Sequence, residues 1–260
     1  MLPEKMTIID LKESGKFNFN DLSLEDNYVV LVKARDLIKF EELLCFSKTL
    51  GKPLVYGDKE YYTFDTAILE NELHYDGISS DGKRVIPDWL IFYIEQEIKQ
   101  KGGEFRALNC ESVLNDIDKD VIEIIENLPL EFYGFPTLYE PKPKSFDITF
   151  SIKTIINEKN KRVLRMHLPT DDKEFYSVEP DYVHCKIDDF RLRFKDMTGP
   201  ETAEIFNNLR KVCYSEKHMM KIPMEAGDIL FMKNKYTFHG RLKYIPPATR
   251  IIHRIQVVCD

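Results

Sequence analysis

The sequence lacks several features that define whole classes of protein. No apolar run is long enough to cross a bilayer, and the N-terminal residues, with Glu4 and Lys5 among them, contain no apolar signal-peptide core. Internal repeats, low-complexity tracts and Gly/Ser linkers are absent as well. We therefore expect a cytoplasmic protein that has no membrane partner.

Cysteine is scarce and its spacing is uninformative. The five cysteines are odd in number and widely separated: Cys45, Cys110, Cys185, Cys213 and Cys259. No two of them have the close spacing of a zinc-ligand pair. Reduced thiols in a reducing compartment are the simplest interpretation.

Positive charge is also in short supply. Lys and Arg number 37 against 44 Asp and Glu, which gives a formal net charge of −7. A phosphate backbone requires a basic face, so we expect no nucleic acid partner. With 43% hydrophobic and 31% charged residues, the 260-residue chain has the composition of a globular protein that can bury a sizeable core. We expect residues 1–260 to form a single domain.

Short apolar runs dominate the pattern along the chain. They predict strands over residues 27–34, 89–95, 146–154, 162–167 and 183–186. Helical spacing predicts helices over residues 37–50, 110–128 and from Gly199 to about Tyr214, the last with Pro200 at its start. Many short strands and few helices favour a mainly β fold with α (α+β), a double-stranded β-helix or jelly roll with helical insertions.

His74-Tyr75-Asp76 is the first of two features that point to a metal. Two imidazoles and one carboxylate can occupy one face of a metal ion and leave three positions for small ligands. This arrangement suits ferrous iron that binds a co-substrate and dioxygen together. A His-x-Asp sequence alone occurs by chance in roughly a third of chains of this length, and more often marks a turn than a ligand pair.

The second feature is the context of His239. A Gly227-Asp228 turn leads into an apolar run that predicts a buried strand, and His239 follows within a few residues. We therefore expect His239 at or just past the end of that strand. Its neighbours Gly240 and Arg241 complete a His-Gly-Arg sequence.

Arg250 opens another run that predicts a strand, over residues 251–258. Alternation places Arg250, Ile252 and Arg254 on one face, and Ile251, His253 and Ile255 on the other. Guanidinium forks match carboxylate geometry, so two arginines that share a face are suited to binding carboxylates. His253 faces away from them and is expected to be structural.

Taken together, these residues resemble the iron(II)/2-oxoglutarate-dependent oxygenases of the taurine dioxygenase and clavaminate synthase-like superfamily. The resemblance extends from about Tyr28 to the end of the chain and is strongest for a natural-product branch that includes carbapenem synthase and isonitrile-forming desaturases. The matched elements are His74-x-Asp76, Gly102-Gly103, Gly227-Asp228, His239, Arg250 and Arg254. In this superfamily the strand and helix near the N-terminus form an α/β cap.

The resemblance implies that His74, Asp76 and His239 are the catalytic metal ligands and hold Fe(II). The co-substrate 2-oxoglutarate would chelate the metal, and its far carboxylate would reach Arg250. Arg254 is expected to bind the co-substrate or the substrate. Dioxygen would take the remaining coordination position, and Asp76 argues against halogenation because halide-transferring relatives have a small residue there.

One position departs from the pattern of the superfamily. Many relatives have a threonine that bonds the co-substrate shortly after the double glycine, and Phe105 occupies that place here. Arg106 or another polar side chain would take over this role, or the alignment shifts by one residue.

The implied activity is hydroxylation or desaturation of a small, amino-acid-derived metabolite, with release of succinate and CO2. An isonitrile-forming oxidative decarboxylation is the alternative within the same branch. A non-catalytic β-barrel binding protein and a zinc hydrolase are alternatives of other classes, and neither explains the combination of Arg250 with the three metal ligands. A small-molecule substrate is the expected partner, and a homo-oligomer is left open.

Overall fold

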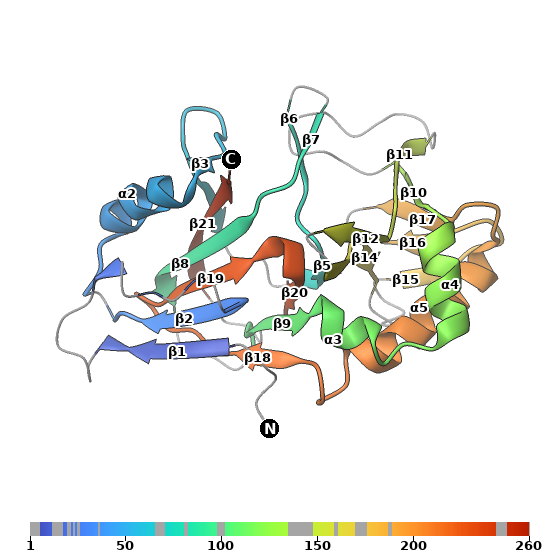
Figure 1. Ribbon diagram of the computed structural model, residues 1–260. Coiled ribbons are helices and arrows are strands. Elements are labelled where there is room, and N and C mark those ends of the chain that lie inside the picture. Colours follow the sequence, from blue (N-terminus) through green and yellow to red (C-terminus); the bar gives the residue numbers. More distant parts are fainter. Residues whose placement is uncertain are drawn as a thin grey trace. The chain divides into compact units, whose positions relative to one another are not determined.

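The computed structural model describes residues 6–11, 18–19, 22, 24, 27–35, 37–65, 71–80, 83–97, 102–134, 148–158, 161–169, 176–186, 189–242 and 249–259. These residues form many strands and few helices (Figure 1), which confirms the prediction of a mainly β fold with α. None of the described helices combines the length and apolar character needed to span a bilayer.

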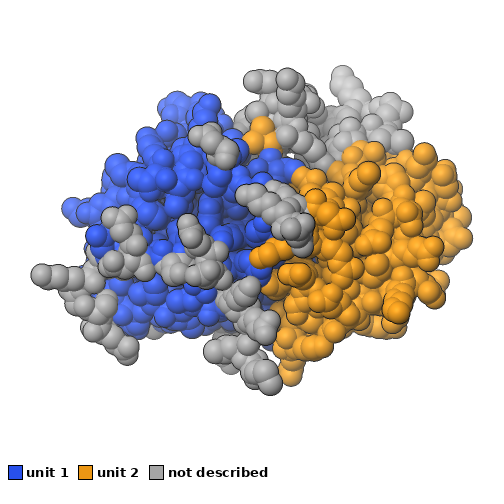
Figure 2. Space-filling view, in the orientation of Figure 1, with its two compact units in different colours: residues 1–71, 86–107, 220–260 blue, residues 72–85, 108–219 orange. Residues whose placement is uncertain are grey.

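The chain divides into two compact units, coloured blue and orange in Figure 2. Unit 1 comprises residues 1–71, 86–107 and 220–260, and unit 2 comprises residues 72–85 and 108–219. Each unit therefore combines segments that are distant in the sequence. The prediction of a single domain remains a prediction.

Unit 1 is built on a seven-stranded sheet in which β8 is central. The order is β1-β2-β19-β8-β21-β3, and β4 pairs with β21. The β1–β2 pair is parallel, whereas β2, β19, β8 and β21 pair antiparallel. The strands are β1 (Met6–Asp10), β2 (Val29–Lys33), β3 (Lys52–Pro53), β4 (Tyr62–Asp65), β8 (Trp89–Glu97), β19 (Ile229–Lys233) and β21 (Arg250–Val258). The predicted strands 27–34, 89–95 and 251–258 are thus confirmed.

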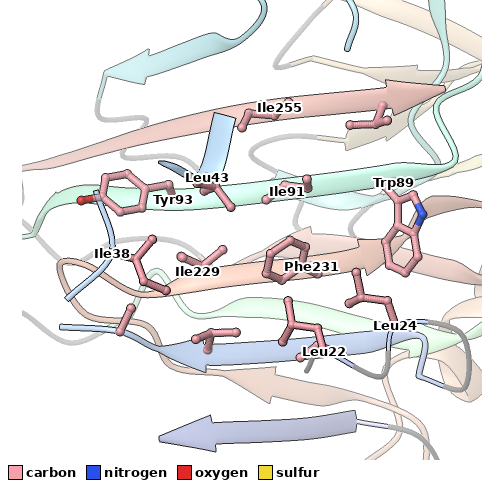
Figure 3. Packing of buried hydrophobic residues seen from close by; sticks show 14 of the residues in the cluster. Leu22, Leu24, Ile38, Leu43, Trp89, Ile91, Tyr93, Ile229, Phe231 and Ile255 are labelled. Atoms are coloured by element: carbon pink, nitrogen blue, oxygen red, sulfur yellow. The ribbon is translucent and has the colours of Figure 1, made fainter. Parts of the chain in front are cut away.

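One face of this sheet packs under helix α2 (Phe40–Leu50). Ile91, Phe231 and Ile255 project from neighbouring strands into this core, together with Leu43 from α2 (Figure 3). The helix begins three residues later than predicted. The Glu42 carboxylate accepts a hydrogen bond from the backbone N–H of Lys39 (3.1 Å) and so fixes the first turn.

The opposite face of the same strands forms a second core. Leu90, Phe92, Leu230 and Ile252 lie in it, packed with Phe105. Since successive residues of a strand point to opposite faces, each of β8, β19 and β21 supplies both cores. This second core also involves β9 (Phe105–Asn109), which pairs antiparallel with β18 (Met220–Ile222).

Unit 2 contains a five-stranded sheet in the order β11-β10-β17-β16-β15, and its described pairs are antiparallel. Two hairpins, β6–β7 and β12–β13, and the β5–β14 pair complete its strands. The bounds are β5 (Asn71–His74), β6 (Ile78–Ser80), β7 (Lys83–Val85), β10 (Leu130–Tyr133), β11 (Ile148–Ile152), β12 (Ile155–Glu158), β13 (Lys161–Leu164), β14 (His167–Leu168), β15 (Tyr176–Val178), β16 (Val183–Cys185) and β17 (Phe190–Phe194).

The helices of unit 2 confirm one prediction and correct another. Helix α5 (Gly199–Cys213) begins where predicted, with Thr198 and Glu201 forming a reciprocal capping box. The predicted helix 110–128 is wrong as one element, because it is two helices, α3 (Cys110–Leu114) and α4 (Lys119–Asn127). Asn115 closes the first helix, and Asp118, with a non-helical backbone, precedes the second. Short polar side chains of this kind favour helix ends over helix interiors.

Candidate active site

His74 and Asp76 of unit 2 lie side by side. His74 is the last residue of β5, and its Nδ1 lies 2.7 Å from the carbonyl oxygen of Glu72. A carbonyl can only accept, so Nδ1 carries the hydrogen and Nε2 keeps its lone pair. That Nε2 lies 3.3 Å from Oδ1 of Asp76. The pair thus presents one imidazole nitrogen and one carboxylate oxygen together, as neighbouring ligands of one ion require.

Glu72 supports this pair through its side chain as well. Its carboxylate is hydrogen-bonded to Nε2 of His167, which lies opposite His74 in the β5–β14 register. The rings of His74 and His167 stack with centroids 6.1 Å apart. His74 is therefore oriented by a carbonyl on one side and a stacked ring on the other, the kind of support that keeps a metal-binding imidazole in place.

His239 of unit 1 lies in the middle of a strand of its own, β20 (Thr237–Arg241), and is only 3% exposed. The expectation that it follows directly on the end of β19 needs correction, since the 3₁₀ turn η2 (Asn234–Tyr236) separates the two strands. The Asn234 side chain fixes this turn by donating to the carbonyl of Pro87 (2.9 Å). The imidazole packs beside the ring of Phe92, and the two ring centroids lie 6.4 Å apart.

Arg250 opens β21, as predicted, and is 2% exposed. Its Nη1 donates to the carbonyl of Gly103 (2.7 Å), and its guanidinium lies over the ring of Phe105, 5.4 Å from the centroid. Gly102 and Gly103 have φ values of 91° and 74°, a region that favours glycine. The double glycine thus places a carbonyl that holds the guanidinium, and Phe105 supports its flat face.

A carboxylate of the protein also lies near Arg250. Oε1 of Glu97 is 3.9 Å from Nε of Arg250. Burial raises the pKa of Glu97 above its usual 4.5, and the charge of Arg250 works against that rise.

Arg254 is 8% exposed, and its guanidinium lies near two rings other than that of Phe105. Its guanidinium is 4.8 Å from the centroid of Phe64 and 6.0 Å from that of Tyr62. His253 lies between the two arginines in the sequence, and its side chain projects from the opposite face of the sheet. There its ring nitrogens lie 3.0 Å from Thr63 Oγ1 and 2.7 Å from Glu95 Oε2. The predicted alternation along β21 is confirmed.

Phe105 and the neighbouring Arg106, at the place of the missing threonine, make different contacts. Phe105 stacks on Arg250, a contact that sequence alone did not indicate. Nη2 of Arg106 donates to the carbonyl of Arg241 at 3.4 Å. Arg106 is thus held against the strand that carries His239.

The mononuclear iron dioxygenases combine several of these features on a mainly β scaffold. They are a His-x-Asp pair with a fixed histidine tautomer, a buried histidine on a separate strand and a buried arginine. The chain belongs to the taurine catabolism dioxygenase TauD, TfdA family, whose model matches residues 46–256. It is accordingly an Fe(II)- and 2-oxoglutarate-dependent dioxygenase, as the motifs predicted. No curated protein matches the chain.

Solved structures share this fold at low sequence identity. The PvcB protein from Pseudomonas aeruginosa is 13% identical, with a TM-score of 0.71, and the match covers 98% of this chain and 86% of that one. A second structure of PvcB, described as an Fe, alpha-ketoglutarate dependent oxygenase from an isonitrile synthetic pathway, is 13% identical with a TM-score of 0.68 over 98% and 86%. A taurine dioxygenase from Burkholderia xenovorans is 17% identical, with a TM-score of 0.61 and the same coverage.

Proposed function

We propose that this dioxygenase hydroxylates or desaturates a small, amino-acid-derived metabolite, with release of succinate and CO2. His74, Asp76 and His239 are its Fe(II) ligands. The observation that carries the assignment is the His74–Asp76 pair, with Nε2 and Oδ1 3.3 Å apart and the His74 tautomer set by the Glu72 carbonyl. This donor set fits ferrous iron, which accepts two imidazoles and one carboxylate on one face.

The proposed fold is a double-stranded β-helix, with an N-terminal α/β cap formed by β2 and α2. The packing of α2 against one face of the unit 1 sheet, in the core that contains Ile91, Phe231 and Ile255, supports such a cap. The second core, which contains Phe92, Phe105 and Ile252, lies on the opposite face of the sheet, where the Arg250 guanidinium stacks on Phe105.

The chain's own residues bind and orient the reactants. Arg250 binds the far carboxylate of 2-oxoglutarate, because its guanidinium is buried, held by the Gly103 carbonyl and flanked by Phe105. Iron and 2-oxoglutarate together supply, when bound, the oxidising power that removes hydrogen from a C–H bond. Phe92, packed against His239, keeps the surroundings of that ligand apolar and limits the access of water.

Arg254 binds the carboxylate of the substrate in this proposal. Arg250 and Arg254 are four residues apart on one strand, so their Cα atoms lie roughly 13 Å apart at the usual rise per residue. Their guanidinium groups also stack on different rings, Phe105 and Phe64. Two separate carboxylates fit this spacing better than one shared carboxylate, which favours a substrate of the amino-acid class.

The metal assignment is tested by iron stoichiometry under anaerobic conditions. His74→Ala and His239→Ala are expected to lose bound Fe(II) while remaining folded. His253→Ala is the matched control, since His253 is a half-buried histidine that contacts Thr63 and Glu95. Stoichiometric iron in either of the first two variants would remove that residue from the ligand set.

The reaction is tested by product mass. Iron-loaded protein is incubated with 2-oxoglutarate, dioxygen and a panel of N-substituted amino acids, and succinate is measured alongside the product. Gain of one oxygen indicates hydroxylation, and loss of two hydrogens indicates desaturation. Loss of CO2 from the substrate as well indicates the isonitrile-type reaction. Substrate-dependent succinate release with carboxylate-free compounds alone would contradict the role of Arg254.

A further inference from the structure

A second group of metal-binding side chains lies in unit 2. Glu72, His167 and Cys185 each offer one ligand atom, and these atoms all lie within 4.8 Å of one another. They come from β5, β14 and β16, three strands that are distant in the sequence. None of the three belongs to the proposed iron ligands.

The surroundings of the cluster are those of an interior site. Glu72 is 5% exposed and Cys185 is 2% exposed. The ring of His167 meets that of Phe190 edge-on, with centroids 5.1 Å apart, and Phe190 lies opposite Cys185 in the β16–β17 register. The imidazole and the thiol are therefore held on one side by the same aromatic residue.

The donor set selects a class of cation. A thiolate, an imidazole and a carboxylate together match borderline-soft ions such as Zn²⁺, whereas Mg²⁺ and Ca²⁺ prefer oxygen ligands alone. Zinc bonds of about 2.0–2.3 Å with tetrahedral angles place ligand atoms about 3.5 Å apart. The three donors are thus within roughly 1.3 Å of that spacing, a shift that side-chain rotation can supply.

We propose that Glu72, His167 and Cys185 form a second cation site, for a divalent ion of the Zn²⁺ class. On binding, the thiol of Cys185 loses its proton to solvent and forms the metal–sulfur bond. The hydrogen that Nε2 of His167 shares with Glu72 is released to solvent and Nδ1 takes one up, so that Nε2 and the Glu72 carboxylate each bind the metal. No electron is transferred. The site does not depend on the iron assignment, although Glu72 also holds His74 through its carbonyl.

Co²⁺ is the probe that distinguishes this site from the proposed iron site. A cobalt–thiolate bond gives an intense near-ultraviolet charge-transfer band, and His74, Asp76 and His239 contain no sulfur. Titration of the protein with Co²⁺ under anaerobic, thiol-free conditions is expected to produce this band and to saturate it within two equivalents per chain, because the proposed iron site can also take one ion. Two equivalents of Zn²⁺ are expected to abolish it.

Variants assign the band to particular residues. Cys185→Ser and His167→Gln are expected to abolish it, and the glutamine keeps a hydrogen-bonding group beside Glu72 should the serine variant fail to fold. Cys213→Ser removes another buried thiol of unit 2 and Asp76→Ala removes an iron ligand, and both are expected to keep the band. Absence of the band in the folded wild-type protein, or its persistence in folded Cys185→Ser, would overturn the proposal. In that case Glu72 and His167 are a hydrogen-bonded pair and nothing more.

Discussion

Arg250 provides the sharpest test of how the chain binds 2-oxoglutarate. In the proposed complex its fork forms two charge-assisted hydrogen bonds with the far carboxylate, each contributing about 1.5–3 kcal/mol. At the lower end, losing both costs about 3 kcal/mol, which corresponds to roughly a hundredfold weaker binding. Arg250→Ala is therefore expected to raise the dissociation constant of 2-oxoglutarate by about that factor. Arg250→Lys keeps the charge but not the fork, and is expected to lose about tenfold.

Anaerobic calorimetric titration of the iron-loaded variants measures these constants directly. Arg254→Ala is the matched control, since it removes a buried arginine from the same face of β21. Iron stoichiometry and thermal unfolding establish that each variant is folded and loaded. A change below threefold in folded Arg250→Ala would refute the assignment, and a large loss in Arg254→Ala instead would move the carboxylate anchor to that residue.

Three further substitutions test the supporting structure. Gly103→Ala places a residue with a side chain at a left-handed backbone conformation (φ 74°), which is expected to cost about 1–2 kcal/mol of stability. It is also expected to weaken 2-oxoglutarate binding, because it shifts the carbonyl that holds Arg250. Wild-type values in both urea unfolding and 2-oxoglutarate titration would contradict this prediction. Thr198→Ala removes the cap of α5 and is expected to cost about 1 kcal/mol, seen as a lower Tm, while iron binding is unchanged. Hydrogen bonds from Lys217, and to a smaller extent from His218, lower the pKa of Asp116 below its usual 3.8, so the stability they contribute is present above that pH and is lost as the pH falls through the lowered pKa. Asp116→Asn is therefore expected to flatten the acid limb of a plot of unfolding free energy against pH. An identical acid limb in both proteins would refute the pairing.

Local patterns predicted the parts of the site that follow from strand geometry. The alternation along β21 correctly placed Arg250 and Arg254 on one face and His253 on the other, because residues of a strand alternate between faces. The start of α5 was likewise visible in the Gly199-Pro200 sequence. Both predictions depend on neighbours in the sequence.

Other features depend on partners that no local pattern identifies. The Glu72–His167 hydrogen bond joins residues 95 positions apart, and Cys185 comes from yet another strand. The turn that separates β19 from β20 is fixed by Asn234 contacting Pro87, 147 positions away. The break between α3 and α4 did have a local signal, the polar residues Asn115 and Asp118, which outweighed the helical spacing of the apolar residues.

The central claim is that one site binds Fe(II) and 2-oxoglutarate together. Its most direct test is an anaerobic titration of metal-free protein with Fe(II) and then 2-oxoglutarate, followed by visible absorption. A charge-transfer band that requires both additions and is lost in His239→Ala is the predicted result. No band in the folded wild-type protein, with Zn²⁺ bound tightly in place of iron, would contradict the claim and favour a hydrolase or a binding protein.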